Sequence, residues 1–446
     1  MPVPLNAPRA FSPNLALFFT LLAAASMLYY HLGLFIPRSH AVLAAQGLGN
    51  GYSFGNDFYQ VWIAARELQQ KKLDPYSAEM TREIQIGLYG RPLDPQRVGD
   101  PIDQRGFPYP AFTNLLFWPT ALLPFPVARI CFVGGLAALA FATVLLWLRA
   151  LRWPLEWPWI TVVVLLVLAS YPALEALYAG QLGLGVAFLL VAAIVSLQRE
   201  RFLLAGTLLA LTTVKPQVTA LVIVYLMFWT IDNWRVRKKF LLGFLVTMGV
   251  LLGTSLAVLP HWIQSWIGTL IAYRRYTRPP LVTEVLTSPL GTHLALPVTL
   301  LLTAAALVMA LVVAWKNRAE SPDSFAFWRA LTLLLAITTA VILPGQAVYD
   351  HVILVPAILL LARHRIELRR ACPAPRALVA VGALVLFWPW MAAAALLTLR
   401  PMLTQEAFRP LLSLPIRTAA SLPFVVLALL AYTWRVEPFT RRESVS

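Results

Sequence analysis

The chain has 446 residues, of which 59% are hydrophobic and 13% are charged, and its mean hydropathy is +0.71. A soluble domain has roughly 25% charged residues, so the composition excludes a soluble globular enzyme and a disordered chain. Two cysteines are too few for a secreted disulfide scaffold. The net charge of +16 fits the cytoplasmic loops of a membrane protein better than a nucleic-acid partner, which we do not expect. We therefore predict an all-α, polytopic integral membrane protein.

The charge distribution sets one region apart from the rest of the chain. Residues 38–110 contain 8 basic and 8 acidic residues, so the whole net charge lies elsewhere. This pattern predicts one long neutral loop near the start, followed by apolar segments with basic connectors. We treat residues 1–446 as a single membrane domain. Its parts are a first span at 14–36, a loop at 37–110, a central transmembrane module at 111–362 and C-terminal spans at 376–434.

About twelve segments are long and apolar enough to enter a bilayer. The first could instead be a signal peptide ending near residues 23–25, although the apolar run continues past that point. Residues 111–125 are short and proline-rich, which favours a re-entrant or interfacial segment. Residues 203–229 are interrupted at Lys215-Pro216-Gln217 and predict two short helices that meet at a turn. The other candidate spans are 127–148, 158–173, 182–197, 240–259, 293–315, 329–344, 348–362, 376–398 and 416–434.

The short basic connectors fix a predicted orientation. If the N-terminus is cytoplasmic and 111–125 does not cross, nearly all of them lie on the cytoplasmic side, together with the C-terminal tail. The long loop at 37–110 is then extracytoplasmic. The polar residues that are rare in a membrane protein collect on the same outer face. They belong to the segments 56–59, 175–181, 215–217, 260–292 and 344–351.

The first candidate site is Asn56-Asp57-Phe58-Tyr59, which opens a predicted amphipathic helix at 57–72 on the outer membrane interface. Asn and Asp are favoured at a helix start, so capping alone can explain Asp57. The functional alternative is a general base at the membrane surface, with Tyr59 beside it as a sugar- or acceptor-binding residue.

A second group of polar residues follows Tyr171-Pro172. Glu175, Tyr178 and Gln181 lie between two predicted spans. An ordinary turn between helices explains them, and a rim that binds sugar hydroxyls is the alternative.

Cationic residues form the third group. A lysine at membrane depth is costly, so Lys215 is a candidate for holding a phosphate, with Gln217 as a neighbouring sugar-binding residue. A lysine that extends from a helix end to the interface is the alternative. Arg274, Arg275 and Arg278 form a second cationic cluster that suits phosphate, although a loop that binds lipid headgroups explains it equally well.

The fourth candidate is the pair Asp350-His351 after the turn Pro344-Gly345-Gln346. His351 can orient or deprotonate an acceptor or donate to a phosphate oxygen, while Asp350 can contact sugar hydroxyls. A lone histidine is more often structural. The sequence contains no phosphate loop, no zinc motif and no nucleophile elbow, so we expect neither a metal nor a cofactor.

The ordered set of motifs resembles glycosyltransferase family 87 of the GT-C superfamily, over roughly residues 14–362. The resemblance rests on Asn56-Asp57-Phe58-Tyr59, Asp74-Pro75-Tyr76, Tyr109-Pro110, Gly180-Gln181, Ala205-Gly206 and Lys215-Pro216-Gln217. It implies a GT-C fold, a polyprenyl-phosphate sugar as donor and catalysis outside the cytoplasm. Asp57 matches the family's catalytic aspartate, and His351 matches a histidine that is important for activity. Lys215 is a recurrent motif residue of the family.

The resulting hypothesis is a transferase that moves a mannose-like sugar, with inversion, from a polyprenyl phosphate to a glycolipid or glycan acceptor. We expect it in a cell membrane, specifically the bacterial inner membrane, in contact with membrane lipids. The sequence leaves the oligomeric state open. A transporter or flippase of a lipid-linked saccharide is the alternative. A polymerase of the O-antigen type is a third possibility, but it would carry its large loop late in the chain.

Overall fold

The computed structural model describes residues 12–49, 51–277, 284, 287–344, 347–370 and 373–433. These residues form helices and connecting loops, with no strand among them, which confirms the predicted all-helical class. Five helical stretches are long and apolar enough to cross a membrane. They are the continuous segment Pro13–Ala45 (α1 Pro13–Leu28, η1 Tyr29–Phe35 and α2 Ile36–Ala45), α7 (Phe125–Ala150), α13 (Trp234–Val258), α16 (Thr292–Lys316) and α20 (Pro373–Leu399).

A sixth span forms if α8 (Trp157–Leu168) and α9 (Tyr171–Ala179), bent by 59° at their junction, are counted as one. The chain is therefore a multi-pass membrane protein, with fewer full-length spans than the dozen predicted. The difference arises because several apolar helices of 10–17 residues reach only about 15–26 Å at 1.5 Å per residue. These are α10 (Gly183–Gln198), α11 with η2 (Phe202–Leu211, Thr212–Val214), α12 (Pro216–Asp232), α17 (Phe325–Val341) and α22 (Leu422–Tyr432).

Two awkward segments form short helices, and the predicted break within 203–229 is confirmed. Residues 111–125 form two short helices, α5 (Phe112–Leu116) and α6 (Trp118–Ala121), before α7 begins at Phe125. The stretch at 203–229 breaks at Lys215, between η2 and α12, where proline follows at the first helical position. The remaining helices are α3 (Asn56–Lys71), α4 (Ala78–Tyr89), α14 (Trp262–Thr277), η3 (Ser288–Leu290), η4 (Val348–Leu354), α18 (Val355–Arg363), α19 (Arg365–Arg370), η5 (Arg400–Met402), α21 (Gln405–Phe408), η6 (Arg409–Ile416) and η7 (Ala419–Ser421).

The core of the helical bundle surrounds α17, whose residues are buried from Ala326 to Val341. The helices α11 and α13 approach closely at two glycines. A methyl group on Gly206 would lie 2.0 Å from the Phe240 carbonyl oxygen, and one on Gly243 would lie 2.1 Å from that of Leu203. Such small-residue contacts let helices pack without a hydrophobic driving force in a bilayer.

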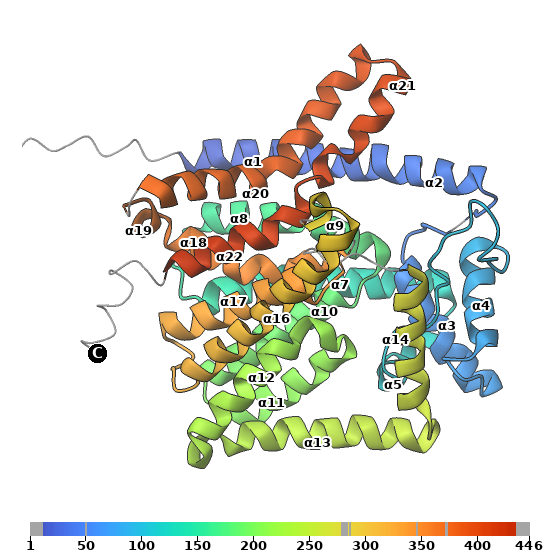
Figure 1. Ribbon diagram of the computed structural model, residues 1–446, viewed down its shortest axis with the longest axis horizontal. Coiled ribbons are helices and arrows are strands. Elements are labelled where there is room, and N and C mark those ends of the chain that lie inside the picture. The colour runs from blue at the N-terminus through green and yellow to red at the C-terminus, as the bar shows by residue number, and fades with distance from the viewer. Residues whose placement is uncertain are drawn as a thin grey trace, which may run out of the picture.

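The basic connectors gather at one end of the bundle. Gln198 Nε2 donates to the Ala150 carbonyl at 2.9 Å and to Asp323 Oδ1 at 3.0 Å, and Arg237 Nη1 donates to the carbonyl of Arg318 at 3.2 Å. These contacts tie four separate connectors together. At the other end, α3, α4 and α14 lie across the bundle axis, far from α19 (Figure 1).

Candidate functional site

A cavity of about 370 Å³ lies at the end of the bundle that carries α3 and α14. Its polar lining comes from six separate parts of the chain. These residues are Asp57, Gln60, Asp103, Arg105, Tyr109, Gln181, Lys215, Gln217, Tyr273, Arg274, Tyr349 and Asp350. The structure thus brings together Asp57, Gln181, Lys215, Gln217, Arg274 and Asp350, which the sequence singled out as four separate groups.

Asp57 lies in the first turn of α3. The helix begins after Gly55, whose φ of 75° is in the left-handed region and whose N–H donates to the Tyr178 carbonyl at 2.7 Å. The carboxylate accepts hydrogen bonds at Oδ1 from Arg105 Nη1 (3.1 Å) and Asn56 Nδ2 (3.2 Å), and at Oδ2 from Gln181 Nε2. A capping role therefore does not account for Asp57, because its side chain bonds to groups that line the cavity.

The turn after α9 delivers Gln181 to this carboxylate. Gly180 ends the helix with a φ of 71°, and a methyl group there would lie 3.0 Å from the Phe58 Cβ. Glycine is thus required both for the left-handed backbone and for the close approach to α3. Gln181 is 3% exposed, and its amide joins two charged residues, because Nε2 donates to Asp57 while Oε1 accepts from Lys215 Nζ at 3.2 Å.

Lys215 is buried at the break between η2 and α12, with 5% of its surface exposed. Its Nζ lies 2.6 Å from Asp350 Oδ1 and 4.9 Å from the centre of the Tyr349 ring. A lysine that extends to the interface would be exposed, so that interpretation is wrong. The ion pair and the Gln181 contact satisfy a charge that is otherwise costly at this depth.

Arg105 is a site residue that the sequence interpretation missed. Its backbone has a φ of 58°, and its N–H donates to Asp103 Oδ1 at 2.9 Å. Its Nε donates to the Tyr89 hydroxyl at 3.1 Å. Burial alone would lower the pKa of Arg105, but Tyr89, Asp57 and Asp103 raise that pKa well above its usual value. The guanidinium therefore stays charged beside Asp57. Its position in the charged segment 77–107 was the one available signal.

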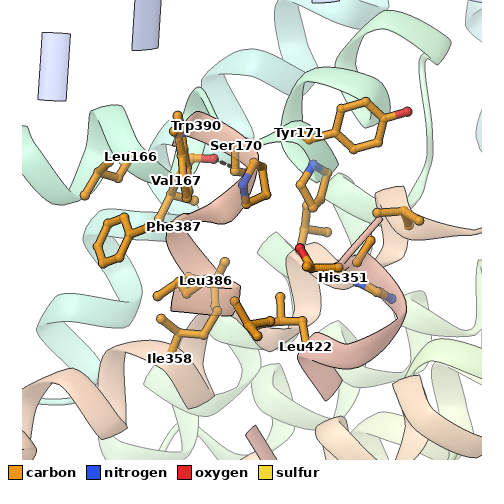
Figure 2. A pocket seen from close by; sticks show the side chains of 18 of the residues that line it. Leu166, Val167, Ser170, Tyr171, His351, Ile358, Leu386, Phe387, Trp390 and Leu422 are labelled. Atoms are coloured by element: carbon orange, nitrogen blue, oxygen red, sulfur yellow. Dashed lines mark hydrogen bonds between the residues drawn. The ribbon is translucent and has the colours of Figure 1, made fainter. Parts of the chain in front are cut away.

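The structure places His351 away from the cavity that contains Asp57. It lines a second, mainly apolar cavity of about 200 Å³ between α8, α9, α18, α20 and α22, together with Tyr171 and Trp390 (Figure 2). His351 is 4% exposed, and its Nδ1 has no hydrogen-bond partner among the described residues. The neighbouring Asp350 faces the first cavity, so η4 separates the two.

Glu175 and Tyr178 also lie outside the first cavity. Glu175 accepts from the Tyr52 hydroxyl at 2.7 and 2.6 Å and lies 3.7 Å from His31 Nε2. The Tyr178 ring packs against Tyr52, with ring centres 5.3 Å apart. This cluster is connected to the start of α3, because the Tyr178 carbonyl accepts a hydrogen bond from the N–H of Gly55, which precedes that helix.

Two more of the candidate residues, Tyr59 and Arg275, lie outside the first cavity. The Tyr59 ring packs edge-on against Phe125, with ring centres 4.9 Å apart, rather than lining the cavity. Arg275 borders a shallow depression on the outer side of α14. Arg278 lies outside the described residues, as does the Gly345-Gln346 part of the predicted turn. Within the described part of the chain, no three His, Cys, Asp or Glu side chains are grouped to hold a metal ion.

In this multi-pass membrane protein, three carboxylates (Asp57, Asp103 and Asp350) and three cations (Arg105, Lys215 and Arg274) surround one cavity, a set of groups that suits an enzyme's binding site for a polar substrate. The family model for glycosyltransferase family 87 matches residues 107–344, slightly more than half of the chain. The chain belongs to this family, as the sequence motifs predicted, and is a membrane glycosyltransferase. Comparisons with curated proteins and with solved structures give no match. The matched range includes Gln181, Lys215 and Arg274, whereas Asp57 and Asp350 lie outside it.

Proposed function

We propose that this glycosyltransferase moves a mannose-like sugar from a polyprenyl-phosphate donor to a lipid- or glycan-linked acceptor, with Asp57 as the general base. The observation that carries the proposal is the single cavity that joins the Asp57 carboxylate to the cations Arg105, Lys215 and Arg274. A sugar phosphate needs both kinds of group, because its acceptor hydroxyl must lose a proton while its leaving group gains negative charge.

The reaction is a single displacement at the anomeric carbon, with inversion. The acceptor oxygen attacks that carbon as its proton passes to a carboxylate oxygen of Asp57. The bond between the anomeric carbon and the phosphate oxygen breaks, and its electron pair stays on the phosphate. The products are the glycosylated acceptor and the polyprenyl phosphate.

The three cations differ in exposure, and we assign their roles in phosphate binding accordingly. Arg105 and Arg274 reach the cavity from the surface side, with 21% and 62% of their side chains exposed. Lys215 lies at the buried end and is already paired with Asp350. Arginine binds phosphate through paired N–H donors, which supports Arg105 and Arg274 as the direct contacts. Lys215 then contributes positive potential and holds Gln181 in place.

The sugar is recognised by neutral polar groups. Gln181 and Gln217 line the cavity and can donate to or accept from sugar hydroxyls. Tyr109 also lines it. Burial, followed by the nearby Asp57 and Asp350, raises the pKa of the Tyr109 phenol, so it remains a neutral hydrogen-bond donor.

The proposed location is the extracytoplasmic side of a cell membrane, the inner membrane in bacteria. It is supported by the basic connectors that gather at the opposite end of the bundle, since positive residues favour the cytoplasmic side. Both termini are then cytoplasmic, and the donor reaches the cavity from the outer leaflet.

The donor class is tested by incubating membranes that contain the full-length protein with a panel of polyprenyl-phosphate sugars and of sugar nucleotides. We expect consumption of one polyprenyl-phosphate sugar and of no sugar nucleotide. Consumption of a sugar nucleotide would refute the proposed donor. Movement of the intact lipid-linked sugar across the proteoliposome membrane, without sugar transfer to an acceptor, would refute the enzymatic proposal and favour a flippase.

A further inference from the structure

The carboxylate of Asp57 is engaged in a way that opposes its proposed task. Arg105, Asn56 and Gln181 together donate three hydrogen bonds to it. A carboxylate has about four acceptor sites, so the donors fill most of them. A general base must accept a hydrogen bond from the hydroxyl that it deprotonates. In this arrangement, Asp57 has little capacity left for an acceptor.

Of the three donors, Arg105 is the one placed to leave. Asn56 is the neighbouring residue in the chain, and Gln181 is 3% exposed and fixed by Lys215 at its other end. Arg105 has 21% of its side chain exposed and lines the cavity. The Tyr89 hydroxyl accepts a hydrogen bond from Arg105 Nε at 3.1 Å, so the outer nitrogens of the guanidinium can change partner while Nε stays in place.

We propose that Arg105 bridges to Asp57 until the donor binds and then transfers to the donor phosphate. This inference rests on the proposed function. A phosphate can take two parallel N–H bonds from the guanidinium, whereas Asp57 takes one from Nη1. The exchange replaces one anion by another beside the same cation, so the guanidinium charge remains compensated throughout.

The exchange imposes an order on the reaction. Donor binding leaves Asn56 as the one remaining donor to Asp57 Oδ1, so this oxygen can accept from the acceptor hydroxyl, and Asp57 becomes an effective base only when a donor is present. When the anomeric bond breaks, its electron pair moves onto a phosphate that Arg105 already contacts, and the acceptor proton moves onto Asp57. Arg105 therefore acts as a catalytic residue in the phosphate contact and as a gate for the base.

If Asp57 and phosphate compete for Arg105, a mutation that removes the Asp57 charge should raise the affinity for phosphate. The Asp57→Asn variant should bind phosphate more tightly than the wild type, although it cannot catalyse transfer. The probe is polyprenyl monophosphate, with uncharged polyprenol as the control ligand, and binding is measured on the full-length protein in detergent. We expect a gain in affinity of about five- to fiftyfold for the phosphate, the range of a charge-assisted hydrogen bond after partial compensation, and no gain for the polyprenol.

The gain must depend on Arg105. In an Arg105→Gln background, replacing Asp57 by Asn should give no gain, and in an Arg105→Lys background the gain should shrink. Arg97→Gln removes an exposed charge from the same loop and should leave binding unchanged. If Arg105→Gln fails to fold, as judged by size-exclusion chromatography, Arg105→Lys carries the test.

The outcomes separate this inference from the proposed function. A wild-type protein that transfers sugar, together with an Asp57→Asn variant that gains no affinity, would overturn the exchange and leave the transferase intact. A gain of the same size in all Arg105 backgrounds would also overturn it, because the effect would then be general charge removal. Failure of the wild type to bind any polyprenyl phosphate would refute the proposed function itself.

Discussion

The ion pair between Lys215 and Asp350 allows the structural role of a buried charge to be separated from its role in catalysis. Lys215 is 5% and Asp350 is 2% exposed, and their charged atoms lie 2.6 Å apart. Replacing Lys215 by Met leaves the Asp350 carboxylate buried without its partner. Breaking a buried pair in this way costs about 3–5 kcal/mol. Replacing both residues, as Lys215→Met with Asp350→Leu, removes both charges and should restore most of that stability.

The assay is unfolding in mixed detergent and SDS micelles, followed by tryptophan fluorescence, with sugar transfer measured on the same preparations. Lys238→Met, an exposed lysine at the other end of the bundle, is the control and should behave as the wild type. We expect the double variant to regain stability but to transfer sugar poorly, because the cavity has lost a cation. A single Lys215→Met variant as stable as the wild type would refute the account of this pair.

Three further predictions concern neighbouring features. Gly183→Ala should lower the rate of sugar transfer about tenfold or more without unfolding the protein. The added methyl group would lie 2.7 Å from Asp350 Oδ1 and would displace the ion pair between Lys215 and Asp350. An unchanged transfer rate would contradict this prediction. Asp100→Asn should speed hydrogen exchange in residues 92–104 at neutral pH. Hydrogen bonds from Arg91 and from the Asp94 N–H lower the pKa of Asp100. The stability that the ionised carboxylate gives to this loop is therefore fully present at neutral pH and is lost only as the pH falls well below the ordinary aspartate pKa. Equal exchange rates in the variant and the wild type would contradict this prediction. Cysteines placed at Glu79 and Arg235 should react with an impermeant reagent from opposite sides of the membrane. Labelling of both cysteines from the same side would contradict the predicted topology.

The helical class and the meeting of distant polar residues were predictable from the sequence. Asp57, Gln181, Lys215 and Asp350 are polar residues in or beside apolar segments, and the positive-inside rule assigns them all to one face. Because a polar group inside a bilayer needs partners, such residues converge when they share a face. The structure adds the order of contacts, in which Gln181 joins Asp57 to Lys215.

The sequence could not distinguish Asp350 from His351. Adjacent residues in a helical turn point about 100° to 120° apart, so one residue of such a pair can face a cavity while the other faces away from it. No apolar period flanks the pair strongly enough to decide which one does. The motif Glu175 to Gln181 divides for a similar reason, because the left-handed turn at Gly180 redirects Gln181 toward α3 while Glu175 faces Tyr52.

Arg105 was inaccessible to sequence reasoning for a different reason. It lies in an irregular loop, where no periodicity relates a residue's position to its direction. Its place beside Asp57, 48 residues away in the chain, depends on the left-handed backbone at Arg105 and on the contacts of Tyr89 and Asp103. Only the folded chain brings these together.

The most direct test of the account is the rate of sugar transfer from a polyprenyl-phosphate donor by the Asp57→Asn protein, reconstituted beside the wild type and an Asp94→Asn control. Asp94 is an exposed aspartate outside the cavity. We predict that Asp57→Asn folds and inserts normally but transfers about 100- to 10,000-fold more slowly, the usual contribution of a general base, while the control matches the wild type. Transfer by Asp57→Asn at near wild-type rate would contradict the assignment of this cavity as the active site.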